Sequence, residues 1–129
     1  MQTEITVLLV DDHSLVRRGF RRMLEDDPDI RVVGEAGNGR EAIDAALQLE
    51  PRVIVMDMAM PEMDGVEATR EIRKRMPNAC VLIVSMYSQE NYVRKALEAG
   101  AQGYILKNAD EVDLAAAIRE VANGKQVID

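Results

Sequence analysis

The sequence predicts an α/β fold in which a central parallel sheet is covered by helices on both faces. Short apolar runs rich in β-branched residues alternate five times with amphipathic stretches of helical spacing. The apolar runs show little polar alternation, which is typical of strands buried on both faces. Because each strand is followed by a helix, right-handed crossovers should join the strands into a parallel sheet.

The five expected strands have similar lengths, and each is β-branched and apolar: residues 5–10, 31–36, 52–56, 80–84 and 103–106. The helices between them are expected at residues 15–24, 39–49, 66–76, 89–99 and 111–123. Ser14, Ser88 and Asp110 are expected helix N-caps, and Gly100 and Gly124 should end helices. This arrangement predicts a flavodoxin-like (βα)5 doubly wound sheet with strand order 2-1-3-4-5.

Composition limits the class of protein. The 129 residues fit one compact domain, which we place at residues 1–124. The net charge of -7 argues against direct nucleic-acid binding by this segment. The single cysteine, Cys80, lies in an apolar run, which indicates a buried structural thiol in a reducing compartment. We see no targeting segment and no membrane span, so we expect a soluble, cytoplasmic protein.

Acidic residues follow the two strands between which the strand order reverses. Asp11 and Asp12 follow the first strand, and Asp57 follows the third. Ligands of open α/β sheets bind at this crevice. Carboxylates about 4 Å apart repel by roughly 4 kcal/mol at an effective dielectric near 20, so a proton or a cation must lie among them. A few hard oxygen ligands favour magnesium (Mg2+), and nothing in the sequence suits zinc.

Two further polar residues end strands on the same edge, namely Ser85 and Lys107. An aspartate nucleophile, a metal, a hydroxyl and an ammonium are the groups that phosphoryl transfer requires. We interpret His13, the only histidine, as an exposed residue at a helix start rather than a ligand. We interpret the arginines of the first helix as a solvated helix face, with contact to a partner or to a second copy of the domain as the alternative; they are Arg17, Arg18, Arg21 and Arg22.

These residues together resemble the receiver domain of two-component response regulators, over nearly the whole chain. The motifs are Val10-Asp11-Asp12, Met56-Asp57, Met60-Pro61-Glu62-Met63-Asp64-Gly65, Ser85 and Gly103-Tyr104-Ile105-Leu106-Lys107. Asp11-Asp12-His13-Ser14-Leu15-Val16-Arg17-Arg18-Gly19 and the segment ending in Lys107 are similar to the LuxR/NarL subgroup.

The resemblance implies Asp57 as the phosphoacceptor. Mg2+ would be bound by side chains of Asp12 and Asp57, by the backbone carbonyl of Ala59 and, mainly through water, by Asp11. It implies no enzyme activity beyond self-phosphorylation and autodephosphorylation at Asp57.

The resemblance also assigns the remaining site residues. Lys107 would pair with the phosphoryl group, Ser85 would follow that group inward, and Tyr104 would change rotamer in response. The family more often has Thr at the position of Ser85. At the next position, Met86 is bulkier than the small residue that many receivers have. Met86 therefore bears on water access and on the phosphoryl lifetime.

The resemblance implies a sensor histidine kinase as partner, a homodimer on phosphorylation, and no membrane contact. Residues 125–129 would begin a linker to a C-terminal helix-turn-helix domain that alone contacts DNA and regulates transcription. A stand-alone receiver acting through protein contacts is one alternative. A second alternative is a small aspartyl-phosphate phosphatase, which is disfavoured because Ala59 stands where such enzymes have a second acid. A third is a flavin- or nucleotide-binding module, which is disfavoured because Asp11 and Asp12 repel anions.

Overall fold

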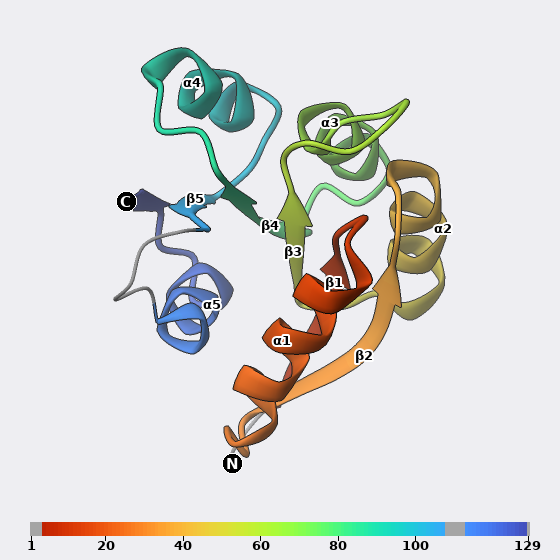
Figure 1. Cartoon of the computed structure of the whole chain (residues 1–129), viewed down its shortest axis with the longest axis vertical. Coiled ribbons are helices and arrows are strands. Elements are labelled where there is room, and N and C mark those ends of the chain that lie inside the picture. Colours follow the sequence, from red (N-terminus) through yellow and green to blue (C-terminus); the bar gives the residue numbers. More distant parts are fainter. Residues whose placement is uncertain (1–3, 108–112, 129) are drawn as a thin grey trace.

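The computed structural model describes residues 4–107 and 113–128, and within them a single parallel sheet carries helices on both faces (Figure 1). The strands are β1 (Ile5–Val10), β2 (Ile30–Ala36), β3 (Val53–Asp57), β4 (Cys80–Ser85), β5 (Gly103–Leu106) and β6 (Val127–Ile128). The helices are α1 (Ser14–Glu25), α2 (Gly39–Leu49), α3 (Gly65–Arg75), α4 (Glu90–Glu98) and α5 (Leu114–Ala122).

The sheet has the order β2-β1-β3-β4-β5-β6, and every neighbouring pair is parallel. The predicted flavodoxin-like order 2-1-3-4-5 is confirmed. The two-residue strand β6 extends it, since Val127 pairs with Gly103 and Ile128 with Tyr104. Sequence reasoning did not predict this strand, because two residues carry no readable periodicity. The proposed linker start at residue 125 stays a prediction.

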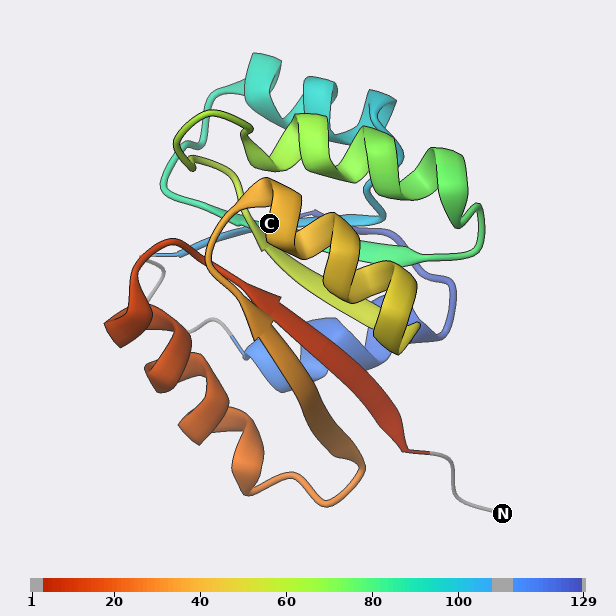
Figure 2. The ribbon, with the colours of Figure 1, turned by 90° about the vertical axis from the view of Figure 1, so that its right-hand side faces the viewer.

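The helices divide unevenly between the two faces of the sheet. Helices α1 and α5 cover one face, and α2, α3 and α4 cover the other (Figures 1 and 2). Successive residues of β1 alternate between the two cores: Val7 and Leu9 pack with α1 and α5, whereas Leu8 and Val10 pack with the other three helices. Both faces of the strand are therefore buried, which explains its nearly unbroken apolar sequence.

The N-caps of three helices differ from the expected ones. Helix α1 already includes Ser14, and His13 occupies the N-cap position, because the turn after β1 closes when the Asp11 side chain accepts a hydrogen bond from the His13 amide. Helix α4 has Gln89 rather than Ser88 as its N-cap. The side chain of Asp113 caps α5 by accepting from the Ala116 amide; the expected cap Asp110 and the expected start at 111 lie outside the described residues.

Candidate functional site

Parallel strands place their carboxyl ends on one edge of the sheet, and acidic side chains gather there. Asp11 and Asp12 follow β1, and Asp57 is the last residue of β3. One ligand atom each from Asp11, Asp12, His13 and Asp57 all lie within 4.8 Å of one another. Asp11 and Asp57 are only 2% and 4% exposed. The proximity that the strand order predicted is thus observed.

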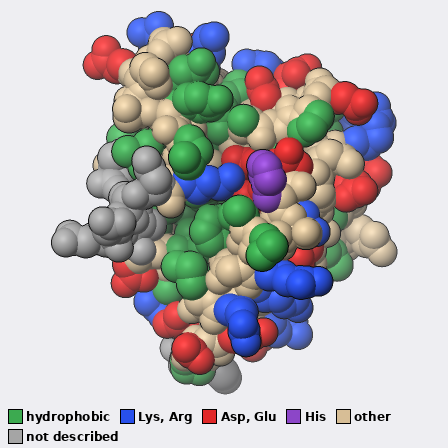
Figure 3. Space-filling view, in the orientation of Figure 1, with side chains coloured by type: hydrophobic (Ala, Val, Ile, Leu, Met, Phe, Trp, Pro, Cys, Tyr) green, Lys and Arg blue, Asp and Glu red, His purple; other side chains and the backbone are tan. Residues whose placement is uncertain are grey.

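Lys107 follows β5 and extends its ammonium into the acidic cluster. Its Nζ lies 2.9 Å from Asp11 Oδ2 and donates a hydrogen bond to Asp57 Oδ1 at 3.1 Å. The surface view shows the single histidine beside acidic and basic side chains at the mouth of this site (Figure 3). Lys107 therefore bridges two buried carboxylates and offsets part of their repulsion.

The cluster changes the acidity of its members. Burial raises the pKa of Asp57 to about 6; the Lys107 hydrogen bond opposes this rise and the Asp11 charge reinforces it. Burial alone would lower the pKa of Lys107, but its hydrogen bonds to Asp11 and Asp57 outweigh burial and raise it above its ordinary value. Lys107 is therefore charged at neutral pH, while Asp57 is destabilised as an anion unless more positive charge reaches it.

The oxygen atoms of the cluster are suitable ligands for a divalent cation. Asp12 Oδ1 is buried and accepts no hydrogen bond from any described residue, although the exposed His13 ring places Nδ1 3.2 Å away. A buried carboxylate oxygen without a donor is destabilised, and a hard cation would satisfy it. The side chain of His13 is 68% exposed, which agrees with the interpretation of a helix-start residue. Ala59 lies two residues after Asp57 on the loop to α3.

Gly65 is a residue of this site whose role sequence reasoning did not identify. A Cβ atom at this position would lie 2.2 Å from the backbone oxygen of Asp57, a distance that no packed side chain adopts. The Gly65 amide also donates to the Met58 carbonyl at 2.8 Å. Helix α3 therefore begins in direct contact with the backbone of Asp57. The signal was present, since the Asp64-Gly65 pair carried part of the resemblance, but its purpose depends on a tertiary contact.

Ser85 and Tyr104 are connected through one loop residue, Tyr87. The fully buried Ser85 accepts a hydrogen bond from the Tyr87 amide at Oγ, at 2.9 Å. The Tyr104 hydroxyl donates to the Tyr87 carbonyl at 2.6 Å, and Tyr104 is also fully buried. Burial raises the pKa of Tyr104, so its hydroxyl keeps its proton and remains a donor. Both predicted switch residues thus hold the β4–α4 loop in its observed position.

Comparison with known proteins identifies the family. The model of the response regulator receiver domain matches residues 7–119. The chain belongs to this family.

Its relatives among curated proteins and solved structures are response regulators and include proteins of the LuxR family and NarL. The chain is 44% identical to the response regulator protein VraR of Staphylococcus saprophyticus over 125 residues, 97% of this chain and 60% of VraR. It therefore spans about 60% of the length of this curated relative. A LuxR family response regulator from Aurantimonas sp. SI85-9A1 superposes with a TM-score of 0.93 at 38% identity, over 97% of this chain and 89% of that one. The receiver domain of NarL from Mycobacterium tuberculosis superposes with a TM-score of 0.90 at 32% identity, over 95% of this chain and 99% of that one.

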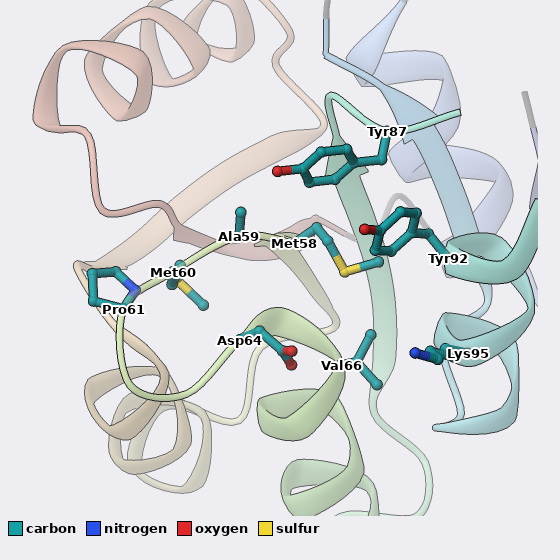
Figure 4. Close-up of a pocket in the computed structure, with 9 residues that line it drawn as sticks. All are labelled: Met58, Ala59, Met60, Pro61, Asp64, Val66, Tyr87, Tyr92 and Lys95. Carbon is teal, nitrogen blue, oxygen red and sulfur yellow. The ribbon is translucent and has the colours of Figure 1, made fainter. Parts of the chain in front are cut away.

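Beside the acidic cluster the receiver domain has an open cavity of about 520 Å³, between the start of α3 and helix α4 (Figure 4). Its lining residues are Met58, Ala59, Met60, Pro61, Asp64, Val66, Tyr87, Tyr92 and Lys95. The rings of Tyr87 and Tyr92 stack with centroids 4.8 Å apart. Since Tyr87 also contacts Ser85 and Tyr104, a movement of either residue would change the wall of this cavity.

The arginines of α1 do not form the uniformly solvated face that we expected. Arg17 and Arg21 both pair with Glu35 on β2, whereas Arg18 and Arg22 are exposed. The helical spacing put all four on the polar side of α1, but only the tertiary structure brings Glu35 to two of them. None of the described helices of the receiver domain is long and apolar enough to cross a membrane.

Proposed function

We propose that this receiver domain is a cytoplasmic phosphorylation switch in which Asp57 accepts a phosphoryl group from the phosphohistidine of a sensor histidine kinase. One observation carries the proposal. Asp57 is buried, its carboxylate contacts the Lys107 ammonium at 3.1 Å, and its pKa of about 6 leaves it ionised at neutral pH. A buried, ionised carboxylate beside a fixed cation is poised to attack phosphorus and to have its product stabilised.

The residues that would hold Mg2+ are Asp12 and Asp57 through their side chains, Ala59 through its backbone carbonyl, and Asp11 through water. The donor set supports this assignment, because it consists of hard oxygens and includes the unsatisfied Oδ1 of Asp12. When bound, the ion would neutralise negative charge on the phosphoryl oxygens. Lys107 would contact the same group from the β5 side of the site.

The transfer is a substitution at phosphorus. A carboxylate oxygen of Asp57 forms a bond to phosphorus while the bond from phosphorus to the donor nitrogen breaks, and that nitrogen keeps the electron pair. For dephosphorylation, water hydrolyses the acyl phosphate, which releases inorganic phosphate and restores the carboxylate of Asp57. The only catalysis we propose is therefore this self-phosphorylation and autodephosphorylation at Asp57.

The switch would act through the loop that Ser85 and Tyr104 hold. We propose that the Ser85 hydroxyl turns to the phosphoryl group, which removes the acceptor of the Tyr87 amide. Tyr104 would then lose its fixed partner on the same loop and change rotamer. Phosphorylation must favour this second arrangement by a few kcal/mol to shift the population of the domain.

For the whole protein we propose a transcriptional regulator that dimerises on phosphorylation. VraR is called a response regulator protein, and this chain covers 60% of it, which leaves room in such a relative for a further domain. A C-terminal helix-turn-helix domain joined by a linker beginning near residue 125 would contact DNA, because the net charge of -7 makes the receiver itself unsuited to that task.

Phosphorylation is tested by mixing the protein with acetyl phosphate and Mg2+ and measuring the intact mass. The wild type should gain one phosphoryl group. Asp57→Ala should gain none, and Asp44→Asn, which alters an exposed carboxylate on α2, should behave like the wild type. An unmodified wild type, or an adduct on Asp57→Ala, would refute the proposal.

Dimerisation is tested by gel filtration with and without a beryllofluoride phosphoryl mimic. The wild type should elute earlier with the mimic, and Asp57→Ala should not respond. An unchanged elution volume for the wild type, at concentrations where the mimic binds, would contradict the dimer.

A further inference from the structure

Arg17 connects helix α1, strand β2 and the acidic loop at one point. Its Nε donates to Glu35 Oε1 at 2.9 Å, and its Nη1 donates to the backbone oxygen of Asp11 at 2.5 Å. Arg21 donates to the other oxygen of Glu35, also at 2.5 Å. The side chain of Arg17 is only 19% exposed, so its guanidinium is held in place rather than free in solvent. We call Arg17, Arg21 and Glu35 the α1 clamp.

The clamp completes the fixation of the Asp11 backbone. The Asp11 amide donates to the Ala36 carbonyl at 3.1 Å, and Asp11 Oδ1 accepts from the His13 amide at 2.8 Å. The remaining polar backbone group, the Asp11 carbonyl, accepts from Arg17. This carbonyl belongs to the planar peptide unit that continues into Asp12. Fixing it therefore fixes the plane from which the Asp12 side chain extends.

We propose that Arg17 is a positioning residue for the divalent-cation site, and that it acts through the Asp11 carbonyl to aim the Asp12 carboxylate. The proposal rests on the proposed function, because it concerns the affinity of the same site for its cation. The orientation of Asp12 matters for cation binding, because its buried Oδ1 has no hydrogen-bond donor among the described residues. Groups that orient metal ligands typically change metal affinity by 10- to 100-fold when removed.

Charge and positioning make opposite predictions for Arg17, which makes the role testable. A guanidinium near an acidic cluster repels a second cation, so its removal by charge alone would strengthen metal binding. Its removal would weaken binding if its task is to aim Asp12. Glu35 limits the charge effect, because its hydrogen bond to Arg17 lowers its pKa and keeps it ionised beside the two arginines. The sign of the change therefore decides between the two roles.

The test is a titration of the whole chain with Mn²⁺, an oxygen-seeking divalent cation whose unbound fraction is measured by electron paramagnetic resonance. We expect Arg17→Gln to bind Mn²⁺ roughly tenfold more weakly than the wild type. Arg17→Lys keeps the charge but has one terminal nitrogen in place of the fork, so it should also bind more weakly. If Arg17→Gln fails to fold, judged by circular dichroism, Arg17→Lys carries the test.

Two controls separate positioning from charge and from stability. Arg18→Gln removes the same charge from an exposed site on the same helix and should leave Mn²⁺ affinity within about twofold of the wild type. Arg119→Gln breaks the comparable pairing of Arg119 with Asp27 and Asp29 at the other end of α1, which lowers stability without reaching the acidic loop. Its Mn²⁺ affinity should not change.

Tighter or unchanged Mn²⁺ binding by folded Arg17 variants would overturn the role of Arg17 and leave the proposed function intact. Equal losses in Arg17→Gln and Arg119→Gln would also overturn it, since the effect would then follow stability. A wild type that binds no Mn²⁺ would overturn both the role of Arg17 and the proposed cation site.

Discussion

The carboxyl edge and the amino edge of the sheet belong to the same strands, yet polar side chains are buried at the first and partly exposed at the second. At the carboxyl edge, Asp11, Asp57 and Ser85 are almost completely buried. At the amino edge, Arg119 pairs with Asp27 and Asp29 while each side chain keeps more than a quarter of its surface exposed. An open cavity of about 450 Å³ also lies there, lined by Glu50, Pro51, Arg52, Met76, Asn78, Ala79, Cys80 and Ala122.

The difference separates polar groups that stay partly hydrated from polar groups that are costly to bury. A partly exposed ion pair such as Arg119–Asp29 needs less desolvation and contributes modestly to stability. Burying Asp57 beside Asp11 costs free energy that Lys107 only partly offsets, as the pKa of about 6 indicates. A fold keeps such an arrangement for binding or chemistry rather than for its own stability.

The largest effect is expected from a methyl group at Gly65. Gly65→Ala places a Cβ against the backbone oxygen of Asp57, which cannot move aside, so we expect a loss of about 3 kcal/mol in the free energy of unfolding. Urea denaturation measures it. The matched control is Gly34→Ala on β2. Its Cβ would lie 2.7 Å from the end of the half-exposed Leu49 side chain, which can move aside, and in ordinary contact with Leu8 at 3.5 Å, so it should cost less than about 1 kcal/mol. Similar losses at both positions would show that packing around Gly65 is no tighter than packing around Gly34.

The two edges should respond to pH with opposite signs in the metal-free chain. Burial raises the pKa of Asp57 from 3.8 to about 6, so its favourable contribution is complete below pH 3.8 and is lost as pH rises through 6. The Arg119 hydrogen bond lowers the pKa of Asp29, so its contribution is present above pH 3.8 and is lost as pH falls below that value.

The measurement is the unfolding free energy of the wild type, Asp57→Asn and Asp29→Asn between pH 3 and pH 7. Relative to the wild type, Asp57→Asn should gain on the order of 2 kcal/mol between pH 4 and pH 7. Asp29→Asn should be less stable than the wild type at pH 7 and converge with it in acid. The comparison fails if Asp57→Asn shows no gain across this range.

Cation binding should stabilise the chain through one edge alone. Mg2+ at ten times its dissociation constant should stabilise the wild type by about 1.4 kcal/mol, measured by thermal unfolding. Asp12→Asn should lose most of this response, because it removes a ligand, while Asp29→Asn should keep it. An equal response in Asp12→Asn would remove that residue from the cation site.

The smallest effect concerns two glutamates with left-handed backbone. Glu62, on the loop after Asp57, has φ of 69°, and Glu50, which ends α2, has φ of 47°. Glycine adopts this region without strain, so Glu62→Gly and Glu50→Gly should each stabilise by about 0.5 kcal/mol. Only Glu62→Gly should also weaken Mn²⁺ binding, since it loosens the loop that carries Ala59. Equal binding by both variants would show that this loop does not position a ligand.

Much of the fold could be read from the sequence because burial on both faces leaves an unmistakable pattern. The boundaries of the five expected strands differ from the observed ones by at most one residue, and the order predicted for five alternating strands and helices is the observed one. Gly100 and Gly124 end helices with positive φ, as expected. Helix starts were less readable, because His13 reaches the cap position through a turn closed by the Asp11 side chain.

The sequence by itself determined which residues meet at the carboxyl edge, because the order of parallel strands brings Asp11, Asp57 and Lys107 together whatever their side-chain details. Only the tertiary structure decided how they are held: Arg17 reaches the Asp11 carbonyl and Glu35 together, and Gly65 lies against the Asp57 backbone. Periodicity reports which face of an element is buried, and it carries no information about which partner, distant in sequence, a polar side chain will contact.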